Sequence, residues 1–258
     1  MAEEITRANA VLLEALAAHS GLVCLVGAGG KKTTLYRLAM AHSGRVGITS
    51  TVAIPPFPRT LTAQQVIADD SVIGTAVVEA AARARVVAFA KPSSKSGRLR
   101  GLDPSQVTAI FRAAKFDIIL VKADGARSRW IKAPEGDEPQ LPKEASTVIQ
   151  VVSARVMGEP LSDRIAHRVE RLARVLKIQP GDILTAEHIA HLLASEAGML
   201  KGVGRARVVP LINMVDNEAL KDRARQAAAR ALSLSTRFDR VVLAAMSHPI
   251  PWIEVVGR

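Results

Sequence analysis

Apolar and polar residues alternate in blocks along the chain, and the blocks predict helices and strands in turn. Residues 5–18 carry apolar side chains at helical spacing and predict an N-terminal helix. Residues 22–26 are wholly apolar and predict a buried strand, which a glycine-rich turn connects to helical character over residues 33–42. A second strand is predicted over residues 45–49. A strand, a helix and a strand in this order are typical of a β-α-β unit with parallel strands.

The same alternation continues to the end of the sequence. The further predicted helices cover residues 72–83, 104–114, 163–176, 186–193 and 218–231, and the further predicted strands cover residues 86–90, 116–121, 148–152, 208–212 and 241–245. A long irregular segment, residues 123–144, interrupts this alternation of helices and strands. Loops of this length are usually functional or disordered. We therefore expect one α/β domain over residues 1–258, with three layers, a mostly parallel sheet and the organisation of a P-loop NTPase. A small helical insertion is expected near residues 160–205.

Positive charge is concentrated in one stretch of the chain. The sequence has 35 Lys+Arg against 24 Asp+Glu, a formal net charge of +11. Residues 91–132 alone hold 10 basic and 3 acidic side chains, a net charge of +7. Such an excess of positive charge favours binding of a phosphate-bearing partner, whether nucleotide, nucleic acid or anionic membrane. Aromatic residues make up only 3% of the chain, which counts against a platform for stacking single-stranded bases and so against nucleic acid.

Other features of the composition exclude several classes of protein. Cys24 is the single cysteine, so an internal disulfide and a multi-cysteine metal site are excluded. The chain begins Met-Ala-Glu-Glu and lacks the basic and apolar regions of a secretory signal. It also lacks an apolar run of about 18 residues, the length of a transmembrane helix. These patterns predict a cytoplasmic protein with no membrane partner.

The turn after the first strand has the composition of a phosphate-binding loop. Its residues are Gly27, Ala28, Gly29, Gly30, Lys31, Lys32, Thr33 and Thr34. Glycines let backbone N–H groups point at phosphate oxygens, a lysine supplies counter-charge, and a hydroxyl holds Mg²⁺. The G-x-x-x-x-G-K-[ST] template is not met in full, because Lys32 stands where the hydroxyl belongs. We predict a shortened loop with Lys31 on the phosphates and Thr33 or Thr34 as the hydroxyl; an ordinary tight turn with solvated lysines is the alternative.

An acidic residue follows the apolar strand at residues 116–121. Asp124 comes at the carboxyl end of this strand, where a Walker-B-like aspartate helps to hold Mg²⁺. A turn formed by Asp124 and Gly125 is the alternative. The loop that follows is dense in charge, with Arg127, Arg129, Lys132, Glu135, Asp137 and Glu138. Its cations suit a triphosphate or an anionic substrate, and its acids suit metal binding or proton transfer.

Two further candidates lie in the second half of the chain. Asn213 and Asp216 have the Asn-x-x-Asp spacing of guanine-binding proteins, although Met214 replaces the usual lysine. A turn and helix cap at this point is the alternative, and ATP and GTP both stay open. His167 is expected on the helix predicted over residues 163–176. Its role is either at the active edge of the sheet or on a basic, solvated face.

Several of these residues, in order, resemble the YqeC family. The resemblance rests on Gly27-Ala28-Gly29-Gly30-Lys31, Thr49-Ser50-Thr51 with Pro55-Pro56, Ala123-Asp124-Gly125-Ala126, Lys132-Ala133-Pro134 with Glu138-Pro139 and Pro142, His167-Arg168, and Asn213 with Asp216. It implies a nucleotide-binding accessory protein in the maturation of the selenium or molybdenum cofactor of a molybdenum hydroxylase. The hydroxylase or its maturation proteins are then the expected partners. Two residues depart from the family pattern. Lys32 stands where the family usually has Thr or Ser, and Lys122 stands where it usually has Glu. Whether the protein hydrolyses the nucleotide therefore stays open.

Three functions follow from these patterns. The first is a maturation factor that binds ATP or GTP with Mg²⁺, with Lys31 on the phosphates and Thr33 and Asp124 on the metal. In this hypothesis Lys132 and His167 face the substrate. The second is a small-molecule kinase or a ligase, because the short glycine loop is also similar to that of the Mur ligases. The third is a basic nucleic-acid-binding module, whose affinity would fall steeply with salt.

Overall fold

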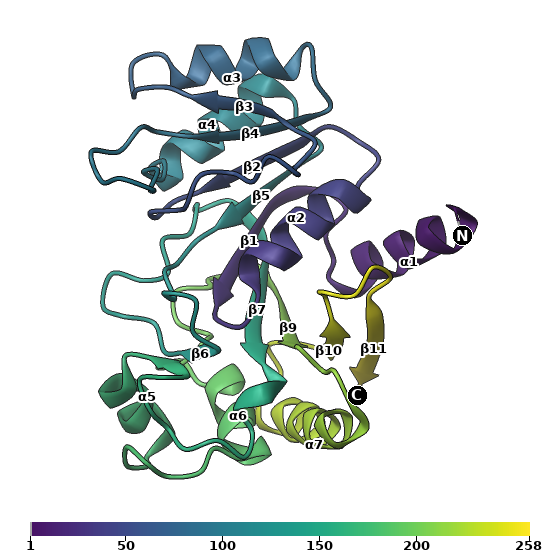
Figure 1. Ribbon diagram of the computed structural model, residues 1–258, viewed down its shortest axis with the longest axis vertical. Helices are drawn as coiled ribbons and strands as arrows, with labels where there is room; N and C mark the ends of the chain where they lie inside the picture. The colour runs from purple at the N-terminus through teal and green to yellow at the C-terminus, as the bar shows by residue number, and fades with distance from the viewer. Residues whose placement is uncertain (1) are drawn as a thin grey trace.

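The computed structural model describes residues 2–258 as a central sheet covered by helices on both faces (Figure 1). The helices are α1 (Ala2–Ala15), α2 (Lys31–Ala41), α3 (Ile73–Ala81), α4 (Pro104–Ala114), α5 (Val169–Leu176), α6 (Ala186–Ala194) and α7 (Glu218–Leu234), with a 3-10 turn, η1, at Ala154–Val156. The strands are β1 (Gly21–Gly27), β2 (Val46–Ser50), β3 (Gln64–Ile67), β4 (Val86–Ala90), β5 (Ile118–Lys122), β6 (Ile131–Lys132), β7 (Ala145–Ser153), β8 (Ala166–His167), β9 (Arg207–Asn213), β10 (Arg240–Ala245) and β11 (Trp252–Gly257). None of the described helices combines the length and the apolar character needed to cross a membrane.

The main sheet has nine strands in the order β11-β10-β9-β7-β1-β5-β2-β4-β3. Neighbouring strands run parallel except for β10 and β11, which are antiparallel. Strand β1 lies in the centre, with Cys24 opposite Val121 of β5 on one side and Val148 of β7 on the other. The predicted α/β fold with a mostly parallel sheet is confirmed. Because parallel strands end at the same edge, the loops after β1, β2, β5 and β9 gather there.

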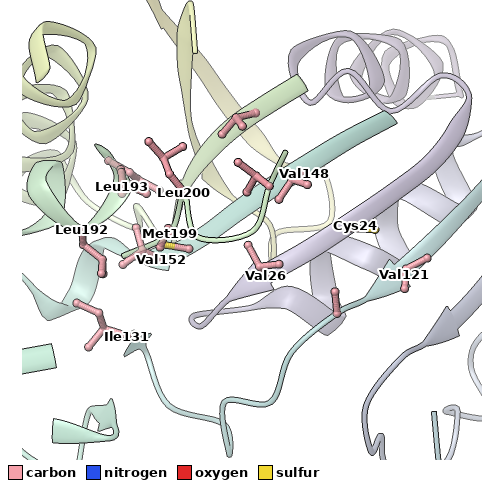
Figure 2. Close-up of a cluster of buried hydrophobic side chains, with 14 of the residues drawn as sticks. Cys24, Val26, Val121, Ile131, Val148, Val152, Leu192, Leu193, Met199 and Leu200 are labelled. Carbon is pink, nitrogen blue, oxygen red and sulfur yellow. The ribbon is translucent and has the colours of Figure 1, made fainter. Parts of the chain in front are cut away.

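Both faces of the sheet are buried, which explains why the strands are apolar throughout. Val23 and Leu25 of β1 pack into a core under α1 and α2, whereas Cys24 and Val26 pack into the core on the opposite face. Figure 2 shows Cys24 and Val26 in this second core, in a cluster that also includes Met199. Strands covered on both faces lose the alternation of polar and apolar residues that a half-exposed strand shows.

The structure differs from the sequence prediction at two edge strands and at the end of the N-terminal helix. Strand β3 has mostly exposed side chains and begins with two glutamines, so it lacks an apolar block. Strand β11 pairs antiparallel with β10 and extends the sheet beyond the last predicted strand. The N-terminal helix ends at Ala15 rather than at residue 18, because Ala17 has a left-handed backbone with φ 49°. Edge strands are exposed on one side and therefore carry a weaker sequence signal.

Residues predicted as a helical insertion contain α5 and α6, which precede β9 in the chain. Helix α6 packs against α7, and its apolar residues join the same core as α3 and α4. The assignment of residues 1–258 to one domain stays a prediction.

Candidate functional site

The loop between β1 and α2 depends on glycine for its shape. Gly29 and Gly30 have φ angles of 88° and 115°, in the left-handed region. A Cβ atom on Gly29 would lie 2.5 Å from the backbone nitrogen of Ser153, and one on Gly30 would lie 2.2 Å from the side-chain nitrogen of Asn213. Both positions therefore require glycine for conformation and for space. The loop leads directly into the N-terminus of α2 at Lys31, the arrangement that binds phosphates in many proteins.

A cavity of about 680 Å³ opens beside this loop. Its walls also include segments that follow β2, β4, β5 and β9. Among the described residues that line it, none is Asp or Glu, and seven are basic: Lys31, Lys32, Lys95, Arg98, Lys122, Arg127 and Arg129. Five of the seven come from residues 91–132, the stretch that carries most of the net charge. The fold thus directs much of the excess charge of the chain into one cavity.

Three residues in the cavity wall have strained backbones. Arg127, Ser128 and Met214 have φ angles of 45°, 60° and 61° although none is glycine. Conformations of this kind cost on the order of 1–3 kcal/mol each and occur most often at functional sites. Their grouping around one cavity supports a functional role for it.

Lys31 is folded back from the cavity toward a buried carboxylate. Its Nζ lies 2.7 Å from Oδ1 of Asp124 and donates a short hydrogen bond to the carbonyl of Gly27. Only 5% of the Lys31 surface is exposed. Burial lowers the pKa of Lys31, although the ion pair with Asp124 opposes this shift. The ammonium group therefore lies within the loop, between the carboxylate of Asp124 and the carbonyl of Gly27.

Asp124 links the end of strand β5 to the loop between β1 and α2. Its Oδ2 accepts a hydrogen bond of 2.8 Å from the backbone N–H of Gly27 and lies 3.1 Å from Nζ of Lys132. The residue is 1% exposed and does not line the large cavity. Among residues 2–258, no group of three His, Cys, Asp or Glu side chains is placed to hold a metal. The structure does not bring Asp124 and Thr33 to one wall, and the Mg²⁺ site predicted from them stays a prediction.

Lys132 lies at the centre of a buried charge network rather than in the cavity. Its Nζ is 2.5 Å from Oε2 of Glu138 and donates a hydrogen bond of 2.7 Å to the carbonyl of Gly125. Arg168 forms a second, very short ion pair with the same Glu138 oxygen. Burial by itself would raise the pKa of Glu138, but hydrogen bonds from Lys132 and Arg168 outweigh it and lower the pKa to about 2. The network holds the loop after β5 together.

His167 lies on a strand, not on the predicted helix. Ala166 and His167 form β8, which pairs parallel with β6 and sets His167 opposite Lys132. Arg168 adopts a left-handed backbone with φ 67°, so helix α5 can begin only at Val169. Burial lowers the pKa of His167, and the positive charges of Arg168 and Lys132 lower it further. Lys132 and His167 are neighbours, but neither lines the cavity, and their predicted contact with a substrate stays a prediction.

Asn213 supports the loop between β1 and α2 through both ends of its side-chain amide. Its amide nitrogen donates a hydrogen bond of 2.9 Å to the carbonyl of Gly29, and its amide oxygen accepts one of 3.1 Å from the N–H of Met246. Asp216 instead forms an ion pair of 2.6 Å with Arg155 and lies 3.7 Å from His248. Neither Asn213 nor Asp216 lines the cavity. The next residue, Asn217, caps helix α7 by accepting a hydrogen bond from the N–H of Leu220, so the alternative of a helix cap at Asp216-Asn217 is confirmed.

The two threonines of the loop have different environments. Thr33 is exposed and lines the cavity, together with Lys32. Thr34 is fully buried, and its hydroxyl donates a hydrogen bond of 3.2 Å to the carbonyl of Gly30. Of the two predicted hydroxyl donors, Thr33 is the one that can meet a ligand.

The hydroxyls at the end of β2 bind backbone rather than a ligand. Thr49 donates a hydrogen bond of 2.8 Å to the carbonyl of Phe89, and Ser50 donates one of 2.8 Å to the carbonyl of Lys122. Thr51 donates one of 2.7 Å to the carbonyl of Gln140. These residues fix the loops around the site.

Sequence reasoning did not single out Lys95, Arg98 and Trp130, which all line the cavity. The signal for the first two was the basic loop after β4. Lys122 lines the cavity as well, and its Nζ donates a hydrogen bond of 3.1 Å to the carbonyl of Ala53. Burial, together with the nearby charge of Lys31, lowers the pKa of Lys122 to about 7. The charge of the cavity therefore changes near neutral pH.

Comparisons with known proteins agree with the resemblance in the sequence. Residues 23–170, more than half of the chain, match the family model described as YqeC protein. The uncharacterized protein YqeC of Escherichia coli (strain K12) is 30% identical over 187 residues, which cover 70% of this chain and 71% of the relative. The matched residues include the loop after β1, strand β5 and the Lys132 network. The chain therefore belongs to the YqeC family.

Proposed function

We propose that this protein binds a nucleoside triphosphate, ATP or GTP, with its phosphates in the basic cavity. The observation that carries the proposal is the composition of the cavity wall. A glycine loop at a helix N-terminus and seven basic residues line the cavity, and no Asp or Glu among the described residues does. Backbone N–H groups at a helix N-terminus and nearby cations are the usual partners of phosphate oxygens.

Lys31 is the proposed phosphate lysine. On binding, its ammonium group turns from Asp124 toward the phosphates. Leaving a buried carboxylate without a partner is costly. Lys132, 3.1 Å from the other oxygen of Asp124, keeps that carboxylate paired while Lys31 is engaged with the ligand. Because Lys132 remains paired with Asp124, Lys31 can move to the ligand without leaving the carboxylate unpaired.

Mg²⁺ fits the described residues less well than phosphate does. Thr33 is the predicted metal ligand that faces the cavity, while Asp124 lies behind the loop between two ammonium groups. The phosphates are therefore proposed to bind through the cations and N–H groups of the chain. Whether Mg²⁺ strengthens binding is one variable of the test below.

The role proposed for nucleotide binding follows from the family resemblance. We propose an accessory protein, acting in the cytoplasm, for maturation of the selenium or molybdenum cofactor of a molybdenum hydroxylase. The hydroxylase or its maturation proteins would be the partners. Arg98, Arg127 and Arg129 also favour a second candidate, transfer of a phosphoryl group to an anionic small molecule, because they add positive charge to the cavity wall. Product formation from ATP with a panel of carboxylic acids tests this candidate.

Calorimetry with ATP and GTP, with and without Mg²⁺, tests the binding proposal. We expect saturable binding that Lys31→Ala and Lys32→Ala each weaken at least tenfold. Lys32 is exposed, so its variant should keep the fold even if Lys31→Ala does not. Lys143→Ala, at an exposed lysine outside the cavity, is the matched control and should bind like the unchanged protein. Equal affinity for all variants would refute the proposal, as would tight, steeply salt-dependent binding of DNA or RNA in place of nucleotide.

A further inference from the structure

We infer that a second cavity, adjoining the basic one, holds the base and ribose of the nucleotide. This inference rests on the proposed function and extends it to a nucleoside subsite. The second cavity measures about 560 Å³ and lies between α1, α2 and the segment after β2. Helices α1 and α2 pack against each other on the same face of the sheet (Figure 1).

Thr33 lines both cavities, so the two share part of their walls. From there the second cavity follows α2 past Tyr36 and Arg37 to Met40. At a rise of about 1.5 Å per residue, the seven steps from Thr33 to Met40 span roughly 10 Å. A nucleotide whose phosphates lie at the loop can therefore place its ribose and base along this helix.

The wall of the second cavity has the chemistry of a nucleoside site. Tyr36, Met40 and Leu61 supply aromatic and apolar surface, and Asn9 and Thr60 supply a few polar groups. Sites for small molecules commonly combine mostly apolar walls with a few polar groups. Met40 is 40% exposed, and Ile5, which also lines the cavity, is 44% exposed. Apolar side chains left open to solvent at this place are available to cover a base.

The site predicted from Asn213 and Asp216 is less suited to the base. Both ends of the Asn213 amide are hydrogen-bonded, to the carbonyl of Gly29 and the N–H of Met246. Asp216 is paired with Arg155. A base bound there would have to break these contacts. A base bound in the second cavity would leave these contacts of Asn213 and Asp216 intact.

The second cavity should discriminate weakly between adenine and guanine. None of the described residues lining it is Asp or Glu, so it lacks a carboxylate to accept from N1 and the exocyclic amine of guanine. A mostly apolar pocket discriminates between related ligands by a factor of only about 10 to 200 at best. We expect the affinities for ATP and GTP to differ by less than tenfold.

The experiment compares ATP with inorganic tripolyphosphate on the full chain by calorimetry. ATP should bind at least tenfold more tightly than tripolyphosphate, because it adds nucleoside contacts. Tyr36→Ala should lower the ATP affinity at least fivefold, since removing a stacked aromatic costs about 1–3 kcal/mol per base. Met40→Ala should lower it in the same direction. Neither variant should change the affinity for tripolyphosphate by more than twofold.

Two controls separate this inference from the proposed function. Ile183→Ala, at another exposed apolar residue, and Asp216→Ala should leave ATP binding within twofold of the unchanged protein. If neither ATP nor tripolyphosphate binds, the proposed function is wrong, and the nucleoside subsite is wrong with it. If tripolyphosphate binds but ATP binds no more tightly, or if Asp216→Ala rather than Tyr36→Ala weakens ATP, the nucleoside subsite alone is overturned.

Discussion

Lys31 and Asp124 form a buried ion pair, with 2.7 Å between Nζ and Oδ1, across 93 residues of sequence. The pair exists because β5 lies next to β1 in the sheet, so the end of β5 reaches the loop that follows β1. Lys132 pairs with the other oxygen, Oδ2, of the same carboxylate. One aspartate thus organises the loop, its lysine and the segment after β5.

Removing the charge of Asp124 should destabilise the fold strongly. Asp124→Asn leaves the ammonium groups of Lys31 and Lys132 buried without their shared partner. Loss of one member of a buried pair costs about 3–5 kcal/mol of unfolding free energy. Chemical denaturation of Asp124→Asn and of the double variant with Lys31→Met checks this, and the double variant should regain part of the loss. A change below about 1 kcal/mol in the single variant would contradict the role given to Asp124.

The sequence could predict the parts of the site whose signals are local. Gly29, Gly30 and Lys31 follow an apolar block directly, so loop and helix could be placed together. It could not predict that Lys132 would be buried against Asp124 and Glu138, because these contacts depend on how distant segments fold together. His167 was misplaced for the same reason. Its two-residue strand is held by pairing with β6, 35 residues earlier, and leaves no periodicity of its own.

Glu138 should make the fold sensitive to acid in a defined range. Its pKa in the folded protein is lowered from 4.5 to about 2 by Lys132 and Arg168. The ionised carboxylate therefore contributes its full stabilisation above about pH 4.5 and loses it as the pH falls toward 2. We expect the difference in unfolding free energy between the unchanged protein and Glu138→Gln to be constant from pH 7 to 5 and to shrink below that. A difference that does not depend on pH would show that the charge of Glu138 is not what stabilises the network.

Lys122 should make anion binding depend on pH near neutrality. Burial, together with the nearby Lys31, lowers its pKa from 10.5 to about 7, so the amine is mostly protonated at pH 6 and mostly neutral at pH 8.5. Protonation adds a positive charge to the cavity wall, and tripolyphosphate should bind more tightly at pH 6 than at pH 8.5. Comparing the pH dependence with that of Lys122→Gln removes the titration of the ligand itself, which both proteins share. The extra dependence in the unchanged protein should be a few-fold, and parallel curves would exclude Lys122 as its source.

Asn213 should control phosphate affinity without touching the ligand. Asn213→Ala removes the hydrogen bonds to Gly29 and Met246 and leaves a buried carbonyl and a buried N–H unpaired, at a cost of about 1–3 kcal/mol of stability each. Because the carbonyl belongs to the loop proposed to bind phosphates, the loop should become more mobile and tripolyphosphate affinity should fall several-fold. Calorimetry with tripolyphosphate checks this. If Asn213→Ala binds tripolyphosphate like the unchanged protein, the hydrogen bond to Gly29 does not contribute to phosphate binding.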